Sequence, residues 1–439
     1  MSGDYSSIPL ILATAQKVIS EGLICDNCLG RQFAKLSTGL TNRDRGAAIR
    51  LVLAMAADVD AGAFTGAAAD GADNTVHQTF CGDLRLPECC WVCNGLFEDE
   101  ALDLWASRAL SILETIEYET FLVGTRLSGL LSENEELLWE VVGTDYAEPL
   151  KSEVNREVGK RIASRTGKEV NFTEPDVLLL LDLARETVES RIKPTYIYGR
   201  YQKMVRGIPQ TRWYCRECRG AGCKLCNFTG QIASESVEEL IAVRAVEAAR
   251  AAGAKFHGAG REDADARMLG EGRPFVLELI EPRKRTLDLS TLASEINAYC
   301  KEKVVVSDLR FVDRKTVGEL KSGRHDKVYL ATIACAGVDR DTLAWGLGDI
   351  TCTIQQRTPS RVVHRRADLV RKRRVYAAAL ESFSDSDGSA VIRIECEAGL
   401  YVKELISGDS GRTVPSLAEV VGSDVTVTAL DVVAVLEKV

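Results

Sequence analysis

The sequence predicts an α+β protein with a small helical region, then an α/β region, then a larger C-terminal part built on a mostly antiparallel sheet. Helical periodicity surrounds the first cysteine pairs, a strand–helix–strand pattern follows, and consecutive strands with a hairpin come last. The chain has 439 residues, which is too long for a single domain with one ordinary core, and 46% of its residues are hydrophobic, enough to form several cores. We therefore expect two to four domains.

The helical region comes first. Apolar residues at helical spacing predict amphipathic helices at 7–19, 46–56 and 96–113. An Ala-, Gly- and Asp-rich segment at 60–74 has the composition of a flexible loop. Because cysteine pairs flank this loop, the region is predicted to be a small helical domain held together by metal.

The region from 116 to about 195 has an α/β pattern. A strand is predicted near 121–124, and a fully apolar strand at 177–181. Between them, apolar residues at four-residue spacing predict a helix with one buried face, formed by Leu150, Val154, Val158 and Ile162.

The C-terminal part has the most strands. A capping box, Ser236-x-x-Glu239, predicts the start of a helix that runs through 250. Another helix is expected before a basic run that begins at 357. Strands are predicted at 274–280, 304–311 and 327–334, and a hairpin at 375–383 and 390–396 around the turn 385–388.

Eight of the fourteen cysteines fall into four CxxC pairs. Two such pairs supply four thiolates in a tetrahedral arrangement, which is the geometry of a closed structural zinc site without an open position for substrate. The N-terminal pairs are far apart, so Cys81 and Cys89 are alternative ligands there, and free buried thiols are the alternative for both sets. We expect two structural zinc ions, bound by Cys25, Cys28, Cys90 and Cys93 and by Cys215, Cys218, Cys223 and Cys226.

The chain carries no visible export signal. No basic residue precedes Lys17, and no apolar run reaches membrane-spanning length. We therefore expect a cytoplasmic protein without membrane association, in which paired cysteines bind metal rather than form disulfides. With only four histidines, catalysis by histidine triads or histidine-ligated metals has little support.

The net charge of -9 is unevenly distributed. Residues 191–213 carry six basic side chains and no acid, interleaved with Tyr196, Tyr198, Tyr201 and Trp213. Residues 357–374 carry eight basic side chains against one acid. Such stretches suit RNA, because cations bind phosphates and flat groups stack on unpaired bases, although each stretch could also be a solvated face.

A Gly-rich, charged segment precedes the predicted strand at 274–280. It places Asp263 among arginines, and guanidinium groups nearby favour the ionised carboxylate of a nucleophile or base. A solvated turn whose acids and arginines pair with each other is the alternative.

Several motifs in this part carry a family resemblance. They are Gly-Arg261-Glu-Asp263, then Asp265-x-Arg267-Met-Leu-Gly, then Lys327-Val-Tyr329, and a last one around Val402-Lys403. Together with Tyr198-Gly-Arg-Tyr-x-Lys-x-x-Arg-x-Ile-Pro209-Gln-Thr, they resemble the archaeal and eukaryotic tRNA pseudouridine synthases that act on the T loop. The resemblance covers nearly the whole chain, and the second CxxC set resembles an insertion of archaeal members.

The resemblance implies an enzyme that isomerises uridine 54, uridine 55 or both in tRNA, without a redox cofactor or catalytic metal. It implies that Asp263 is the catalytic nucleophile, with Asp265 as the competing candidate. It also implies the substrate-binding residues. Tyr329 stacks on the extruded base, and Val402 and Leu430 pack around it. Lys403 pairs with the catalytic Asp, and Arg261 binds a phosphate.

Each of these residues also has an ordinary structural interpretation. Tyr329 could be a common strand tyrosine, and Lys403 a surface lysine at a strand end. Val402 and Leu430 could be core residues. Arg261 could neutralise its acidic neighbours.

The middle region resembles a THUMP-type RNA-binding domain, which in related enzymes binds the acceptor end of tRNA. The implied organisation is an accessory zinc region at 1–115, a THUMP-like domain at 116–195 and a catalytic domain at 196–439 with a zinc-knuckle insertion at 213–228. tRNA is then the expected partner, and no obligatory protein partner is evident.

THUMP domains also accompany methyltransferases and thiolation enzymes. These need a nucleotide or methyl-donor site in a Gly-rich strand-to-helix turn, and the sequence has no P-loop. A non-catalytic, zinc-stabilised RNA-binding protein is the alternative from another class. Replacement of Asp263 would leave the activity of such a protein unchanged.

Overall fold

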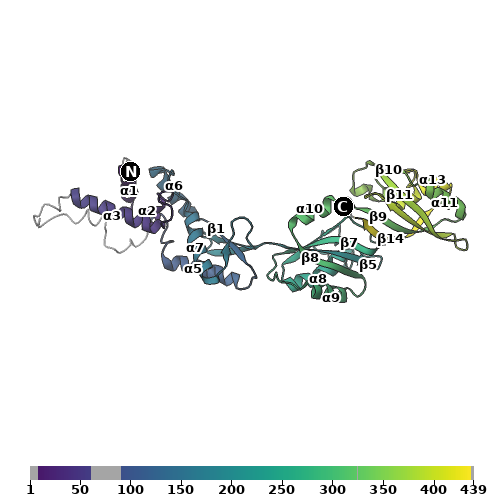
Figure 1. Cartoon of the computed structure of the whole chain (residues 1–439), viewed down its shortest axis with the longest axis horizontal. Coiled ribbons are helices and arrows are strands. Elements are labelled where there is room, and N and C mark those ends of the chain that lie inside the picture. The colour runs from purple at the N-terminus through teal and green to yellow at the C-terminus, as the bar shows by residue number, and fades with distance from the viewer. Residues whose placement is uncertain (1–7, 61–89, 324, 437–439) are drawn as a thin grey trace, which may run out of the picture. The chain divides into compact units, whose positions relative to one another are not determined.

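The computed structural model describes residues 8–60, 90–323 and 325–436 (Figure 1). The chain forms two compact units, Met1–Lys193 and Pro194–Val439. Cys81 and Cys89, the alternative zinc ligands, lie outside the described residues. No helix of the described segments is long and apolar enough to cross a membrane.

The first unit begins with helices. The three helices predicted from amphipathic spacing are confirmed, and a short helix that the periodicity did not indicate, α2, begins at the first CxxC pair. Cys25 caps this helix, since its Sγ accepts a hydrogen bond from the backbone N–H of Cys28. The bounds are Ile8–Ser20 for α1, Asp26–Arg31 for α2, Asn42–Asp60 for α3 and Asp99–Leu113 for α5.

A four-stranded sheet follows in the order β2-β1-β3-β4. β1 pairs in parallel with β2 and β3, and β4 pairs antiparallel with β3. The predicted helix and both predicted strands are confirmed, whereas the amphipathic α6 and the half-exposed β4 were not predicted. The elements are β1 (Thr120–Arg126), α6 (Gly129–Val142), α7 (Leu150–Thr166), β2 (Glu169–Val170), β3 (Val177–Asp182) and β4 (Thr187–Ile192).

One hydrophobic core runs through the first unit. Leu150, Val154, Val158 and Ile162 of α7 are all fully buried, as their four-residue spacing predicts. They belong to the same cluster as Leu29 of α2 and apolar residues of the sheet. The helices beside the first cysteine set and the sheet are therefore stabilised by shared burial of apolar surface.

The second unit contains a ten-stranded sheet in the order β13-β10-β11-β12-β9-β14-β7-β5-β8, with β6 also paired to β7. Among the described strand pairs of this sheet only β14 and β7 are parallel, so the predicted α+β class with a mostly antiparallel sheet is confirmed. The strands are β5 (Thr195–Lys203), β6 (Gly253–Gly258), β7 (Ala266–Ile280), β8 (Val304–Val312), β9 (Asp326–Ala334), β10 (Thr353–Arg357), β11 (Val370–Ser384), β12 (Ser389–Cys396), β13 (Thr413–Val414) and β14 (Thr426–Leu436).

Helices pack against this sheet and form three hydrophobic core clusters with it. The predicted capping box is confirmed, because Ser236 Oγ accepts from the Glu239 N–H and donates to the Glu239 carboxylate at 2.7 Å. The α-helices are α8 (Val237–Ala249), α9 (Leu289–Cys300), α10 (Arg314–Ser322), α11 (Arg340–Asp349), α12 (Val402–Ser407) and α13 (Leu417–Val421), and the 3₁₀ turns are η1 (Lys224–Cys226) and η2 (Ser360–Arg365).

The first basic and aromatic stretch does not form a stacking surface, contrary to the prediction. Most of it is β5, which lies between β7 and β8. A strand paired on both sides and covered on both faces buries its side chains, so Tyr196, Tyr198 and Tyr201 are in the core. Only Trp213, beyond the strand, exposes its ring, at 36%.

Candidate active site

Asp263 lies in the loop that joins β6 to β7. The side chain is 37% exposed, and its Oδ2 lies 3.1 Å from Nη1 of Arg361 and 3.6 Å from Nζ of Lys403. The loop turns at Gly260, whose φ is +77° and where an added Cβ would meet the Arg273 guanidinium at 3.2 Å. The backbone therefore directs a carboxylate toward two cations without packing it into the core.

A pocket of about 900 Å³ opens above this loop. The structure brings all the residues singled out by the resemblance to its wall, although they come from four separate parts of the chain. The predicted site residues that line the pocket are Arg261, Asp263, Tyr329, Val402, Lys403 and Leu430. The competing candidate, Asp265, lines it as well.

Lys403 lies in the first turn of α12 rather than at a strand end, because a helix begins at Val402, after a short connection from the end of β12 at Cys396. Its Nζ is closer to Asp265, at 2.6 Å, than to Asp263. Partial burial is the largest single effect and acts against ionisation of Asp265, but the hydrogen bond and charge of Lys403, together with smaller effects that include the charge of Arg361, outweigh it and lower the pKa of Asp265. One ammonium group is thus shared between two carboxylates, an arrangement that the sequence did not indicate.

Tyr329 and Leu430 lie on adjacent strands, β9 and β14, and Val402 begins α12. Burial raises the pKa of the Tyr329 phenol above its ordinary value. Leu430 and Val402 are 7% and 4% exposed and belong to a core cluster that Tyr329 packs against. This wall therefore offers a neutral ring and two apolar side chains, a surface suited to a flat base.

Arg261 lies beside Trp213, with its guanidinium 5.8 Å from the centre of the indole ring. Its acidic neighbours have other partners, since Glu262 pairs with the buried Arg273 at 2.9 Å and Asp265 pairs with Lys403. The alternative in which Arg261 neutralises these acids has no support among the described ion pairs.

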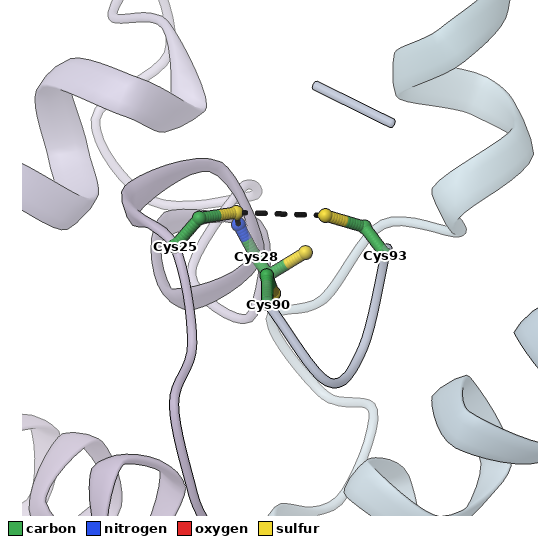
Figure 2. A group of neighbouring side chains, drawn as sticks. All are labelled: Cys25, Cys28, Cys90 and Cys93. Atoms are coloured by element: carbon green, nitrogen blue, oxygen red, sulfur yellow. Dashed lines mark hydrogen bonds between the residues drawn. The ribbon is translucent and has the colours of Figure 1, made fainter. Parts of the chain in front are cut away.

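The four sulfur atoms of the first cysteine set face one another (Figure 2). They lie within 4.8 Å of one another, and the Sγ atoms of Cys25 and Cys93 are 3.7 Å apart. A zinc ion with four bonds of about 2.3 Å requires sulfur atoms about 3.8 Å apart, so the set fits zinc. The fully buried Arg31 donates to Cys28 Sγ at 3.4 Å, as suits an anionic thiolate.

The second cysteine set has the same geometry. The sulfur–sulfur distances are 3.7 Å for Cys215 and Cys223, and 3.8 Å for Cys218 and Cys226. Glycines with positive φ at 220 and 222 let the chain turn back between the two pairs. Both sets therefore fit a closed tetrahedral site, which is the geometry of structural zinc sites.

Comparisons with known proteins match these parts to one family. The model described as "Pus10, C-terminal" matches residues 196–436, and the model described as "Pus10 THUMP domain, archaeal" matches residues 105–182. A tRNA pseudouridine synthase Pus10 of Methanothrix thermoacetophila is 50% identical over 97% of this chain and 94% of its own. The Halorubrum lacusprofundi protein of the same name is 44% identical over 97% of this chain and 96% of its own.

The chain belongs to the Pus10 family. The resemblance inferred from the sequence motifs is therefore confirmed at the level of the family. Among solved structures, a Cbf5–Nop10–Gar1 complex matches 45% of this chain and 45% of its own at 16% identity, with a TM-score of 0.29, too low to support an argument about the fold.

Within the Pus10 C-terminal match, Arg361 is a site residue that the sequence did not single out. It lies in η2 and bridges two acids, with Nε 2.6 Å from the buried Glu404 and Nη1 3.1 Å from Asp263. Burial acts against its charge, but Glu404 and Asp263 outweigh that and raise the pKa of Arg361. In the sequence it was one of eight basic residues in a run, and nothing local distinguishes it from the others.

Proposed function

We propose that this chain is a tRNA pseudouridine synthase that converts uridine 54, uridine 55 or both in the T loop. The single observation that carries the proposal is the convergence of Asp263, Tyr329 and Lys403 on one pocket. The names of the Pus10 relatives, which are tRNA pseudouridine synthases, support the same activity.

Asp263 is the proposed nucleophile. The reaction breaks the bond between N1 of uracil and C1′ of ribose and forms a bond from C5 to C1′, while C5 loses a proton and N1 gains one. Atoms balance without an oxidant or reductant, so no redox cofactor takes part. Arg361 and Lys403 contact the Asp263 carboxylate and would hold it in place for its attack, since opposite charges attract.

The target uridine must leave its stack to reach Asp263, which costs a few kcal/mol. We propose that Tyr329 stacks on the extruded base and that Val402 and Leu430 pack around it. Arg261, which is exposed and carries no ion pair among the described residues, would bind a phosphate next to the flipped nucleotide.

The remaining parts have proposed roles in tRNA binding. We propose an accessory zinc region at 1–115, a THUMP-like domain at 116–195 that binds the acceptor end, and a catalytic domain at 196–439. Each cysteine set would bind one zinc ion, and the two ions would serve only as structural cross-links.

We place the protein in the cytoplasm, where its tRNA substrate is made.

The deciding experiment compares Asp263→Asn with Asp265→Asn on an unmodified tRNA transcript, with chemical mapping of pseudouridine. We expect product at a T-loop uridine with the wild type and none with D263N, while both bind tRNA. D265N is the matched control, because it removes one carboxylate from the same pocket, and should retain at least a tenth of the rate. An active D263N would overturn the assignment of the nucleophile.

The same assay addresses the alternative class of protein. Transcripts with cytidine at position 54 or at position 55 would show which uridine is converted. A wild-type protein that binds tRNA yet forms no pseudouridine at any T-loop uridine would be a non-catalytic RNA-binding protein instead.

A further inference from the structure

Residues 201–210, here called the scaffold segment, belong to a sequence motif that has no part in the proposed reaction. They lie against residues 259–265, here called the nucleophile loop. We infer that the scaffold segment fixes the backbone of the nucleophile loop, with Lys203 as its central positioning residue. This inference rests on the proposed function only for the role of Asp263.

Lys203 ends β5 and is fully buried. Its Nζ donates three hydrogen bonds to carbonyl oxygens, of Ile208 at 2.8 Å, Asp263 at 3.2 Å and Ala264 at 3.1 Å. An ammonium group has three donors, so all are used, and two of them fix the peptide of the proposed nucleophile and the next residue. Burial of a charged ammonium group costs free energy unless hydrogen bonds replace its contacts with water. The three carbonyl oxygens supply these hydrogen bonds to Lys203.

Other groups of the scaffold segment continue the pattern along the nucleophile loop. The Arg206 guanidinium donates to the carbonyl oxygen of Asp265 at 2.9 Å, and the backbone N–H of Gly207 donates to the carbonyl oxygen of Ala264, also at 2.9 Å. The side-chain amide of Gln210 donates to the carbonyl oxygen of Gly260 at 3.0 Å. Four carbonyls of one short loop thus accept from one segment. Arg206 also donates to the carbonyl of Leu430 at 2.6 Å, which ties the loop to the strand beneath the base-binding wall.

A buried side-chain network supports the same loop from within. The hydroxyl of Tyr201 donates to the Glu262 carboxylate at 2.8 Å and accepts from Gln210 at 2.9 Å. Glu262 is paired with Arg273, which donates to the carbonyl of Ala259 at 2.7 Å. Residues on both sides of Asp263 are therefore fixed, while its own carboxylate faces Arg361 and Lys403 in the pocket.

The hydrogen bonds from the scaffold segment affect catalysis because they set the position of Asp263 relative to the substrate. The Asp263 carboxylate is more than a third exposed, so its position depends on the backbone that carries it as well as on its ion pairs with Arg361 and Lys403. A displacement of about 1 Å at a reacting group can cost about 100-fold in rate. Loss of Lys203 should therefore lower kcat for bound tRNA and leave tRNA affinity nearly unchanged.

The test uses the full-length variant Lys203→Met. We expect kcat on the T-loop transcript to fall roughly 100-fold, with KM and the Kd for tRNA within about two-fold. We also expect faster hydrogen exchange of the backbone amides in the nucleophile loop without tRNA. Arg206→Met, whose side chain is 32% exposed and can be lost without a buried gap, should show the same effects at roughly ten-fold.

Two controls separate positioning from loss of stability. Leu292→Ala opens a cavity in the core beneath α9, so its kcat reports the effect of destabilisation alone. Lys303→Met removes a lysine whose ion-pair partner, Glu235, lies outside the nucleophile loop.

The inference is overturned if kcat and loop exchange in K203M and R206M change no more than in L292A at matched stability. The exchange measurement needs no enzymatic activity. If loop exchange rises in both variants while the wild type forms no pseudouridine, the scaffold role stands and the proposed function fails.

Discussion

At the scale of single residues, the site is a balance of charges around Asp263. Lys403 and Arg361 both contact it, and each is shared with a second acid, Asp265 or Glu404. Five charged groups of alternating sign therefore meet here, in the order Asp265, Lys403, Asp263, Arg361 and Glu404, and each cation is held between two acids. The resemblance named one of the two cations, and the structure added the other.

Arg361→Met should lower the rate about 100-fold, because it removes a cation from Asp263 and leaves the buried Glu404 without its partner. The unfolding free energy should fall by about 2 kcal/mol. Initial rates and urea unfolding measure the two effects. Arg357→Met is the control, since Arg357 is half-exposed and pairs with Asp368 outside the pocket; a rate as low in R357M as in R361M would contradict the role of Arg361.

Lys327 gives a pH-dependent prediction. It is 8% exposed, and burial, followed by the nearby Arg273, lowers the pKa of Lys327 to about 8. The unfolded chain therefore binds more protons between about pH 8 and pH 10.4, so stability rises with pH across this window, by roughly 3 kcal/mol. Thermal unfolding of Lys327→Met as a function of pH should lack that rise. Parallel curves for variant and wild type would show that Lys327 is not buried as a cation.

At the scale of elements, short local patterns were reliable where they matched one buried face. The capping box of α8, the apolar stripe of α7 and the hairpin of β11 and β12 all formed as predicted. β5 is an exception. It carries basic and aromatic residues that suit an exposed strand, but its position inside the sheet buries its tyrosines, and position in a sheet is not a local property.

The two cysteine sets should bind zinc independently. Full-length protein should contain two zinc ions per chain by elemental analysis, and one after Cys28→Ser or after Cys218→Ser. C28S should also destabilise the first unit, because the buried Arg31 would lose its thiolate partner. Cys396→Ser is the control: it is a buried core cysteine, and its zinc content should stay at two.

At the scale of the whole molecule, two compact units match two parts of one family, the THUMP model in the first and the C-terminal model in the second. An acidic protein that binds tRNA must do so through local basic surface. The exposed side chains of Lys372 and Arg374 on β11 belong to the basic run at 357–374, which the structure leaves largely exposed.

tRNA affinity should therefore fall steeply with salt. Replacing Lys372 and Arg374 together by Gln should weaken binding and reduce the slope of log affinity against log salt by about 1 to 2. Lys301→Gln, at the end of α9, is the control for loss of one surface charge. Filter binding at several salt concentrations measures both, and an unchanged slope in the double variant would place the tRNA elsewhere.

The sequence by itself determined the fold class, about half of the described helices and strands, both cysteine sets and, through resemblance, several of the residues that line the pocket. These depend on periodicity, spacing and motif order, which are local in the chain. Tertiary structure alone decided that Arg361 faces Asp263 across 98 positions, that Lys403 bonds Asp265 across 138, and that Lys203 lies beneath the loop. Such contacts depend on strand order and burial, because charges interact according to distance in space and not along the chain.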